Sequence, residues 1–297
     1  MRRFDLSAYW KRRQARIEAA LEAALPPAGC APPALHRAMR YAVFSGGKRL
    51  RPLLCLAAAE AVGGSWRQAR APAVALELLH TYTLIHDDLP CMDDDALRRG
   101  KPTCHIVFGE ANAVLAGDAL QALAFAWVAR APAGARYSAA ARVAELAAAA
   151  GSRGVVGGQV ADLAAKGGAP GPRAVRYIHQ HKTADLFRAA LRLGAMAGEG
   201  RPTAVRALGR YGEQLGLAFQ IADDLRDAAP VGKTGRPKDM SCVPVYGLAG
   251  ARRRARRRIA AALAALSALP ARRAAPLAAM ARWVLERADA APAARRG

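Results

Sequence analysis

Residues 74–95 read VALELLHTYTLIHDDLPCMDDD, in which an apolar run with a helical period leads directly into an acidic cluster. The period predicts a helix that ends near Asp87. His80 and Thr83 lie seven and four residues before Asp87, so they share its face. Pro90 interrupts regular geometry, which allows the loop to curl Asp93 back toward Asp87. The stretch therefore predicts paired carboxylates at the end of an apolar helix.

A second acidic cluster follows about half a chain later, in residues 214–227, QLGLAFQIADDLRD. Asp223 and Asp227 are four residues apart and share a helix face, with Gln220 one turn earlier. One such cluster alone is equally typical of a solvated helix end, but two with matched apolar approaches favour a site. Carboxylates without His or Cys suit magnesium, which prefers to be shared with a substrate phosphate. The two clusters thus predict a diphosphate held between them by Mg²⁺.

Three basic segments supply candidate partners for a diphosphate. Residues 45–52, SGGKRLRP, combine two glycines that allow close backbone approach with the cations Lys48 and Arg51. Arg98 and Arg99 are planar donors next to the first acidic cluster. Residues 179–183, HQHKT, add the ammonium of Lys182 and the hydroxyl of Thr183. The alternatives are a basic loop before a helix for the first segment and surface salt bridges for the others.

Composition predicts one large helical domain spanning residues 1–297. The chain is 53% hydrophobic and shows hardly any strand pattern. Residues 167–172 and 229–244 are predicted to be interhelical loops rather than domain linkers. The expected fold class is all-α: a single-domain helical bundle with a central active-site cavity between facing helices.

Cysteine usage and charge bear on location and partners. The five cysteines form no Cys-x-x-Cys pair, and neither an uncharged apolar run of about 18 residues nor a signal-peptide pattern is evident. A cytoplasmic protein with reduced thiols is therefore expected. The net charge is +22, and residues 252–258 read RRRARRR. This run lacks interleaved aromatics, so we expect a solvated helix face, no nucleic-acid partner and at most weak membrane-surface association.

These motifs together, in this order, closely resemble the trans-isoprenyl diphosphate synthases, or polyprenyl synthetase family, and particularly their bacterial farnesyl diphosphate synthase branch. The resemblance spans nearly the whole chain, from residues 46–52 to residues 283–287, WVLER. It implies the isoprenoid-synthase helical fold, a homodimer, and head-to-tail condensation of isopentenyl diphosphate with dimethylallyl or geranyl diphosphate to farnesyl diphosphate. It also implies Mg²⁺ as cofactor, with three ions per site.

The resemblance assigns roles residue by residue. The implied metal ligands are Asp87, Asp88, Asp93, Asp223 and Asp227. The implied catalytic set adds Asp224, Lys182, Thr183 and Gln220 to these carboxylates. Allylic diphosphate binding falls to Arg98, Lys182, Thr183, Gln220 and Lys233, and isopentenyl diphosphate binding falls to Lys48, Arg51, His80 and Arg99.

Product length is the finer question. Tyr82 lies five residues before Asp87, about 7.5 Å deeper along a helix. An aromatic there, with the two-residue Pro90-Cys91 expansion of the first cluster, resembles enzymes that stop at fifteen carbons. A core tyrosine is the alternative for Tyr82, and geranylgeranyl diphosphate synthase is the alternative product class.

Two departures from the family pattern stand near the second cluster. The family's late lysine has no counterpart of matching position, so either Lys238 substitutes for it or allylic binding is weaker. Arg226 stands where an apolar residue is more usual. Two rival functions are a noncatalytic partner subunit, which the intact clusters oppose, and a terpene cyclase, which would not need Lys48, Arg51 and Arg99.

Overall fold

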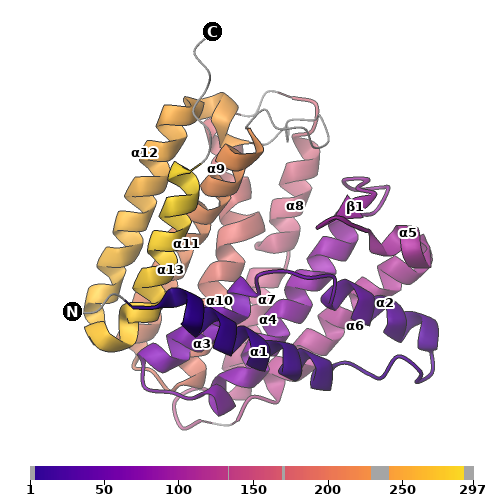
Figure 1. Ribbon diagram of the computed structural model, residues 1–297, viewed down its shortest axis with the longest axis horizontal. Helices are drawn as coiled ribbons and strands as arrows, with labels where there is room; N and C mark the ends of the chain where they lie inside the picture. The colour runs from indigo at the N-terminus through magenta and orange to yellow at the C-terminus, as the bar shows by residue number, and fades with distance from the viewer. Residues whose placement is uncertain (1–3, 133, 169–170, 229–240, 291–297) are drawn as a thin grey trace.

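The computed structural model describes residues 4–132, 134–168, 171–228 and 241–290, and these residues fold as a bundle of helices (Figure 1). In the first half the helices are α1 (Leu6–Ala24), α2 (Pro33–Val43), α3 (Leu50–Ala61), α4 (Trp66–Asp87), α5 (Cys104–Phe108), α6 (Glu110–Ala129) and α7 (Ala139–Ala150). In the second half they are α8 (Val155–Ala164), α9 (Pro172–Ile178), the π-helix η1 (His179–Ala184), α10 (Asp185–Ala197), α11 (Pro202–Asp227), α12 (Cys242–Ala265), the 3₁₀-helix η2 (Leu266–Ala268) and α13 (Ala271–Asp289). The predicted all-α class is confirmed.

The two helices that carry the acidic clusters are built differently. Helix α4 begins with a capping box between Ser65 and Gln68, which satisfies backbone donors of its first turn. Nearly every position from Ala69 to Leu79 is buried, because α3, α6 and α10 surround this helix. Helix α11 is buried against α10, α12 and α13. Both helices end at an aspartate, Asp87 and Asp227, so both acidic clusters lie at helix C-termini.

A short hairpin, absent from the sequence-based expectation, follows the first cluster. Strands β1 (Leu97–Arg98) and β2 (Lys101–Pro102) pair antiparallel, with Arg98 opposite Lys101. Both turn residues have positive φ, 56° at Arg99 and 78° at Gly100. Paired positive φ values match the right-handed twist of a two-residue hairpin. This turn therefore sets the directions in which the side chains of Arg98 and Arg99 project.

The loop expected over residues 229–244 extends too far. Ser241 caps α12 by accepting a hydrogen bond from the Val243 N–H, so residues 242–244 are already helical. Residues 229–240, with Lys233 and Lys238, lie outside the described residues. The expected loop at residues 167–172 ends where α9 begins, at Pro172.

Helix α6 is apolar along much of its length, although it contains the charged residues Glu110 and Asp118. Among the described residues it is the one helix whose length and composition would suit a membrane span, and a third of its apolar window is buried. It packs along α4 and also touches α2, α5 and α7. Core helices of globular proteins pass the same test, so α6 is weak evidence for a membrane.

Candidate active site

The first acidic cluster curls as predicted. The Asp93 N–H donates to the carbonyl of Asp87 at 2.9 Å, which turns the loop after α4 back on itself. The pKa of Asp87 is raised to about 6, chiefly by desolvation and with a contribution from the charge of Asp93, while Lys182 opposes the rise. Lys166 forms an ion pair of 2.8 Å with Asp93. A half-buried carboxylate with a raised pKa is stabilised in its charged form by a bound cation.

Asp88 is directed differently from Asp87. Its buried carboxylate accepts a hydrogen bond of 2.6 Å from Arg98 Nε, and Arg98 Nη2 contacts the same oxygen. Asp88 therefore anchors the hairpin arginine to the end of α4. Arg98 also bonds Asp95 at 3.3 Å. The metal-ligand role of Asp88 and the diphosphate role of Arg98 stay predictions.

In the second cluster, Asp223 is held by two arginines. Arg287 of α13 donates to its Oδ1 at 3.3 Å, and Arg226 pairs with the same oxygen at 3.3 Å. Burial raises the pKa of Asp223, although both arginines lower it. Arg226 also pairs with Asp227 at 3.5 Å. The unusual Arg226 thus neutralises both outer carboxylates of the cluster.

Asp224 points into the protein rather than toward the other aspartates of its cluster. It accepts hydrogen bonds from Gln220 Nε2 at 2.9 Å and from the Cys242 N–H at 2.7 Å, and it lies 3.1 Å from His179 Nε2. Burial alone would raise its pKa, but these partners outweigh burial and lower the pKa. Asp224 therefore ties α11 to η1 and to the start of α12.

The π-helix η1 joins the two clusters. Its Lys182 bonds Asp162 of α8 at 2.5 Å, and Thr183 donates to Gln220 Oε1 at 2.7 Å. Burial lowers the pKa of Lys182, but Asp87 and Asp162 reverse this and raise the pKa overall. A side chain at Gly158 would lie 2.7 Å from the Cα of Lys182, so glycine is what lets α8 approach. π-Helical turns frequently mark functional sites.

The glycine-rich basic segment, residues 45–52, is a loop leading into α3, and we call it the cradle. Its predicted role in binding a diphosphate stays a prediction. Gly46 and Gly47 have φ values of 100° and 129°, which L side chains rarely adopt. Arg51 lies in the first turn of α3, half-buried 5.0 Å from the Phe187 ring, and desolvation lowers its pKa to about 10. Its buried Nε finds no hydrogen-bond partner within the described ranges. A guanidinium with an unused, buried donor is a candidate anion contact.

Two further predicted residues, His80 and Arg99, lie close enough to Arg51 to interact with it electrostatically. Burial lowers the pKa of His80 well below its usual value, with Arg51 and Arg99 next in effect. His80 is therefore neutral at pH 7 and can donate a hydrogen bond without adding charge. Arg99 donates to the Gly46 carbonyl across the loop. The structure thus brings three of the four predicted isopentenyl diphosphate residues together.

Lys48, the fourth residue, lies nearer the second cluster. Its ammonium lies 5.2 Å from the Trp283 ring centroid. Burial and then Arg287 lower its pKa, while Asp223 raises it. The cradle therefore spans the distance between α4 and α11.

Arg49 was not predicted as a site residue, and it is the anchor of the cradle. It is 3% exposed with φ of 50°, a strained value for arginine. Its guanidinium donates to Glu18 at 2.8 Å, to Glu77 at 2.8 Å and to the Val43 carbonyl at 2.7 Å. These bonds hold the loop between α1 and α4.

The donor set fits magnesium shared with a substrate, not a metal held by protein alone. Across the described residues no three His, Cys, Asp or Glu side chains converge on one metal position. Asp88 and Asp224 are bonded within the protein, so Asp87 with Asp93 and Asp223 with Asp227 are the candidate ligand pairs. A metal bound there would displace Lys166 from the first pair and the arginines from the second. Mg²⁺ commonly takes one or two carboxylates and completes its shell with phosphate and water. The outer aspartates meet that need.

Tyr82 is a buried residue of α4, 6% exposed. Its ring lies edge-on to His86, with centroids 5.5 Å apart, and burial raises its pKa. Gln121 of α6 partly opposes this rise. Both predicted roles, core residue and stopper, are compatible with this position.

Sequence reasoning missed several residues that contact the predicted ones. Asp162, Lys166 and His179 pair with Lys182, Asp93 and Asp224 from distant parts of the chain. A weak sequence signal existed for Arg287, which follows Trp283 by four residues and stacks on it at 4.9 Å. Long-range ion pairs leave no local spacing to detect.

Comparison with known proteins agrees with this geometry. The polyprenyl synthetase family model matches residues 32–241. The chain belongs to the polyprenyl synthetase family. Geranylgeranyl pyrophosphate synthase 9 of Arabidopsis thaliana is 42% identical over 95% of this chain and 81% of its own length. Farnesyl diphosphate synthase of Escherichia coli is 46% identical over 64% of each chain.

Coverage and solved structures complete the comparison. Geranylgeranyl pyrophosphate synthase 12 of Arabidopsis thaliana is 44% identical, and the match spans 63% of its length. A crystal structure of an FPP/GFPP synthase from Zymomonas mobilis has a TM-score of 0.85 at 38% identity, covering 94% of this chain and 98% of that one. The helical bundle is therefore the isoprenoid-synthase fold of this family.

Proposed function

We propose that the protein is a magnesium-dependent trans-prenyltransferase that condenses isopentenyl diphosphate with allylic diphosphates. The observation that carries this proposal is the link between the two carboxylate clusters through η1. Lys182 interacts electrostatically with Asp87, its neighbour Thr183 donates to Gln220, and Gln220 donates to Asp224. Beside it, the half-buried Arg51 and the more exposed Arg99 offer a second anion position. One site with two diphosphate positions is what joining two diphosphate substrates requires.

The allylic diphosphate lies between the clusters in this proposal. Lys182 is half-buried and charged, so it offsets negative charge as the diphosphate leaves. Thr183 and Gln220 present oxygen dipoles toward the allylic cation. When bound, Mg²⁺ supplies further charge neutralisation between the outer aspartates and the diphosphate. The apolar lining of α4 and α11 excludes water that would quench the cation.

The isopentenyl diphosphate lies at the cradle. Lys48, Arg51 and Arg99 bind its diphosphate, and neutral His80 donates a hydrogen bond. Its double bond attacks the allylic cation, and the departing diphosphate accepts the proton that is lost. No protein nucleophile is needed.

Product length is proposed as fifteen carbons, with twenty carbons as the second candidate. Buried Tyr82 lies one and a half turns before Asp87, which supports the shorter product. Geranylgeranyl synthases at 42–44% identity favour the longer one. Incubation with Mg²⁺, dimethylallyl diphosphate and labelled isopentenyl diphosphate, followed by chromatography, tests both. Unchanged substrates, or full turnover in excess EDTA, would overturn the proposal.

A second copy of the chain is the proposed partner, in the cytoplasm. Exposed apolar side chains gather on α5 and α6, with Ile106 56% exposed and Leu115 55% exposed. The apolar α6 buries only a third of its window within one chain, so a second copy would cover the remainder. Sedimentation velocity should show a dimer that Leu115→Arg dissociates, whereas a monomeric wild type would contradict the proposal.

A further inference from the structure

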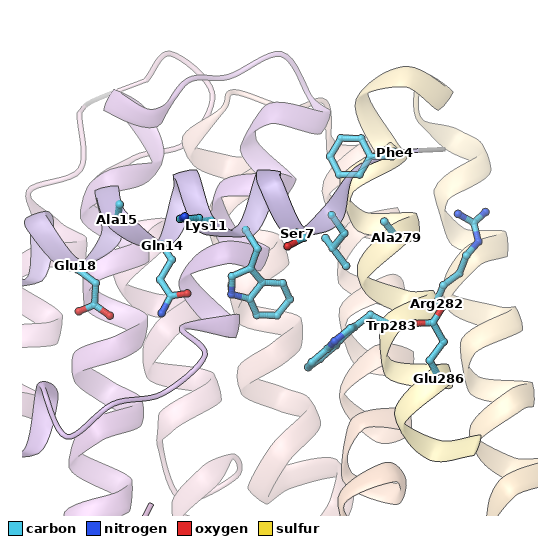
Figure 2. A pocket seen from close by; sticks show the side chains of 12 residues that line it. Phe4, Ser7, Lys11, Gln14, Ala15, Glu18, Ala279, Arg282, Trp283 and Glu286 are labelled. Carbon is cyan, nitrogen blue, oxygen red and sulfur yellow. The ribbon is translucent and has the colours of Figure 1, made fainter. Parts of the chain in front are cut away.

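A cavity of about 690 Å³ lies between α1 and α13, separate from the aspartate clusters. Figure 2 shows its labelled lining side chains arriving from these two helices, with Gln14 and Glu18 on one and Ala279 and Trp283 on the other. Its volume falls within the range of about 300–1,000 Å³ typical of small-molecule sites. None of the residues assigned above to either substrate lines it.

The chemistry of the lining favours one ligand class. Phe4, Leu6, Trp10 and Trp283 provide an apolar and aromatic body. Of the charged residues, Glu18 is already bonded to Arg49, and Glu286 has a partner of its own. Lys11 and Arg282 are exposed and form no ion pair within the described ranges. The free charge at the cavity is therefore positive beside an apolar interior.

The cavity wall is also the support of the basic cradle. Trp10 Nε1 donates to the Lys48 carbonyl at 3.1 Å, and Gln14 Nε2 donates to the Gly47 carbonyl at 3.4 Å. Trp10 lies 5.1 Å from Trp283, whose ring faces Lys48 at 5.2 Å. A ligand inserted between the helices must contact residues that position the cradle.

We propose that the cavity between α1 and α13 binds an amphiphile with an apolar chain and an anionic head group, and that this binding weakens the hold of the cradle on isopentenyl diphosphate. The chain lies against Trp10 and Trp283, and the head group pairs with Lys11 and Arg282. The ligand competes with Lys48 for the face of Trp283 and disturbs the two bonds to the loop carbonyls. The kinetic half rests on the proposed function, whereas the binding half does not.

Calorimetry on the purified protein tests the binding half. Dodecyl phosphate and dodecanoate, each below its micellar concentration, are titrated to separate phosphate from carboxylate head groups, with dodecyltrimethylammonium as the cationic control. We expect an anionic probe to bind and the cationic probe not to bind. Ala279→Trp fills the cavity and should abolish this binding, whereas Ala271→Trp, exposed on α13 outside the lining, should not. Equal binding to Ala279→Trp would overturn the proposal, because the probe would then occupy another site.

Charge reversal keeps the test decisive if Ala279→Trp fails to fold. Lys11→Glu with Arg282→Glu should weaken binding about tenfold or more, as expected when an exposed ionic pair and its field are reversed. Arg12→Glu with Arg272→Glu, both exposed and outside the lining, is the matched control. Equal affinity of the two double variants would overturn the anionic assignment.

Steady-state kinetics tests the coupling. The bound amphiphile should raise the KM for isopentenyl diphosphate about fivefold or more in wild type, and not in Ala279→Trp. A rise confined to the allylic substrate would show competition at the aspartates and overturn the coupling. If the protein has no prenyl transfer activity, calorimetry still tests whether the cavity binds the amphiphile.

Discussion

The two acidic clusters have similar sequences but different surroundings. In each, a buried middle aspartate is bonded within the protein, while the outer ones lie beside basic side chains that a bound metal would displace. Asp88 takes a partner ten residues away, Arg98, whereas Asp224 takes partners from η1 and α12. Lysines lie next to the outer carboxylates of the first cluster, and arginines pair with those of the second. Similar acidic motifs in this chain therefore make different contacts with the rest of the protein.

The largest expected effect tests what the clusters have in common. Asp87→Ala and Asp223→Ala should each lower turnover by orders of magnitude with the helical fold intact, because removing one carboxylate relieves crowding while losing a metal ligand. Turnover and far-ultraviolet circular dichroism are the measurements. Activity above about a tenth of wild type, a barrier change under about 1.4 kcal/mol, would remove that cluster from the mechanism.

The two middle aspartates, Asp88 and Asp224, should contribute differently to the free energy of unfolding. The lowered pKa of Asp224 means that its ionised form stabilises the fold above its unfolded pKa, and this contribution is lost as pH falls below about 4. The raised pKa of Asp88 means that its ionisation opposes folding at pH 7. Asp224→Asn should therefore lower the free energy of unfolding by about 1–3 kcal/mol, and Asp88→Asn by less.

Urea unfolding of both variants and of wild type at pH 7 and at about pH 2.5, below the unfolded pKa, measures this difference. The gap between Asp224→Asn and wild type should narrow at the lower pH. A larger loss for Asp88→Asn would mean that the local arginine anchor matters more than the long-range one.

Variants of the basic residues should show which of them bind isopentenyl diphosphate and which bind the allylic substrate. Lys48→Ala or Arg51→Ala should chiefly raise the KM for isopentenyl diphosphate, and Lys182→Ala should chiefly affect the allylic substrate. The reason is that Lys182 senses Asp87, whereas Arg51 lies with His80 and Arg99. Initial rates with each substrate varied in turn give the answer. The reverse pattern would show that the two subsites are assigned backwards.

Variants of Tyr82 test whether α4 also limits the chain length of the product. Tyr82→Ala should lengthen the product by one or more five-carbon units, because a cavity opens below Asp87. Tyr82→Phe keeps the ring and should keep the product length. Chromatography of the products decides. If wild type already makes mainly twenty-carbon product, or Tyr82→Ala stays at fifteen carbons with normal activity, Tyr82 is a core residue.

The smallest effect concerns Arg226. Its half-exposed guanidinium pairs with Asp223 and Asp227, so it competes with Mg²⁺ for them. Arg226→Ala should lower the half-saturating Mg²⁺ concentration a few-fold, and Arg257→Ala, exposed on α12, should leave it unchanged. An increase in Arg226→Ala would mean that the arginine helps to bind the diphosphate instead.

Local spacing predicted much of the site, and long-range packing supplied the rest. Helical period placed His80 and Thr83 on α4 with Asp87, and Gln220 on α11 with Asp223, because both runs fold as continuous helices. Arg49 looked like one more cation of a basic loop, yet it is buried between Glu18 and Glu77. A sequence does not reveal which charge will meet partners 28 and 31 residues away.

Because of the π-helical turn η1, this segment should tolerate substitutions better than the deletion of one residue. A π-turn holds one more residue than an α-turn over the same rise. Deleting a residue within 179–184 would restore an α-turn and change the directions in which the side chains of this turn project. Lys182 and Thr183 would then lose their alignment with Asp162 or Gln220. Substitutions spread through the core of α10 are thus expected to be tolerated better than a single deletion here.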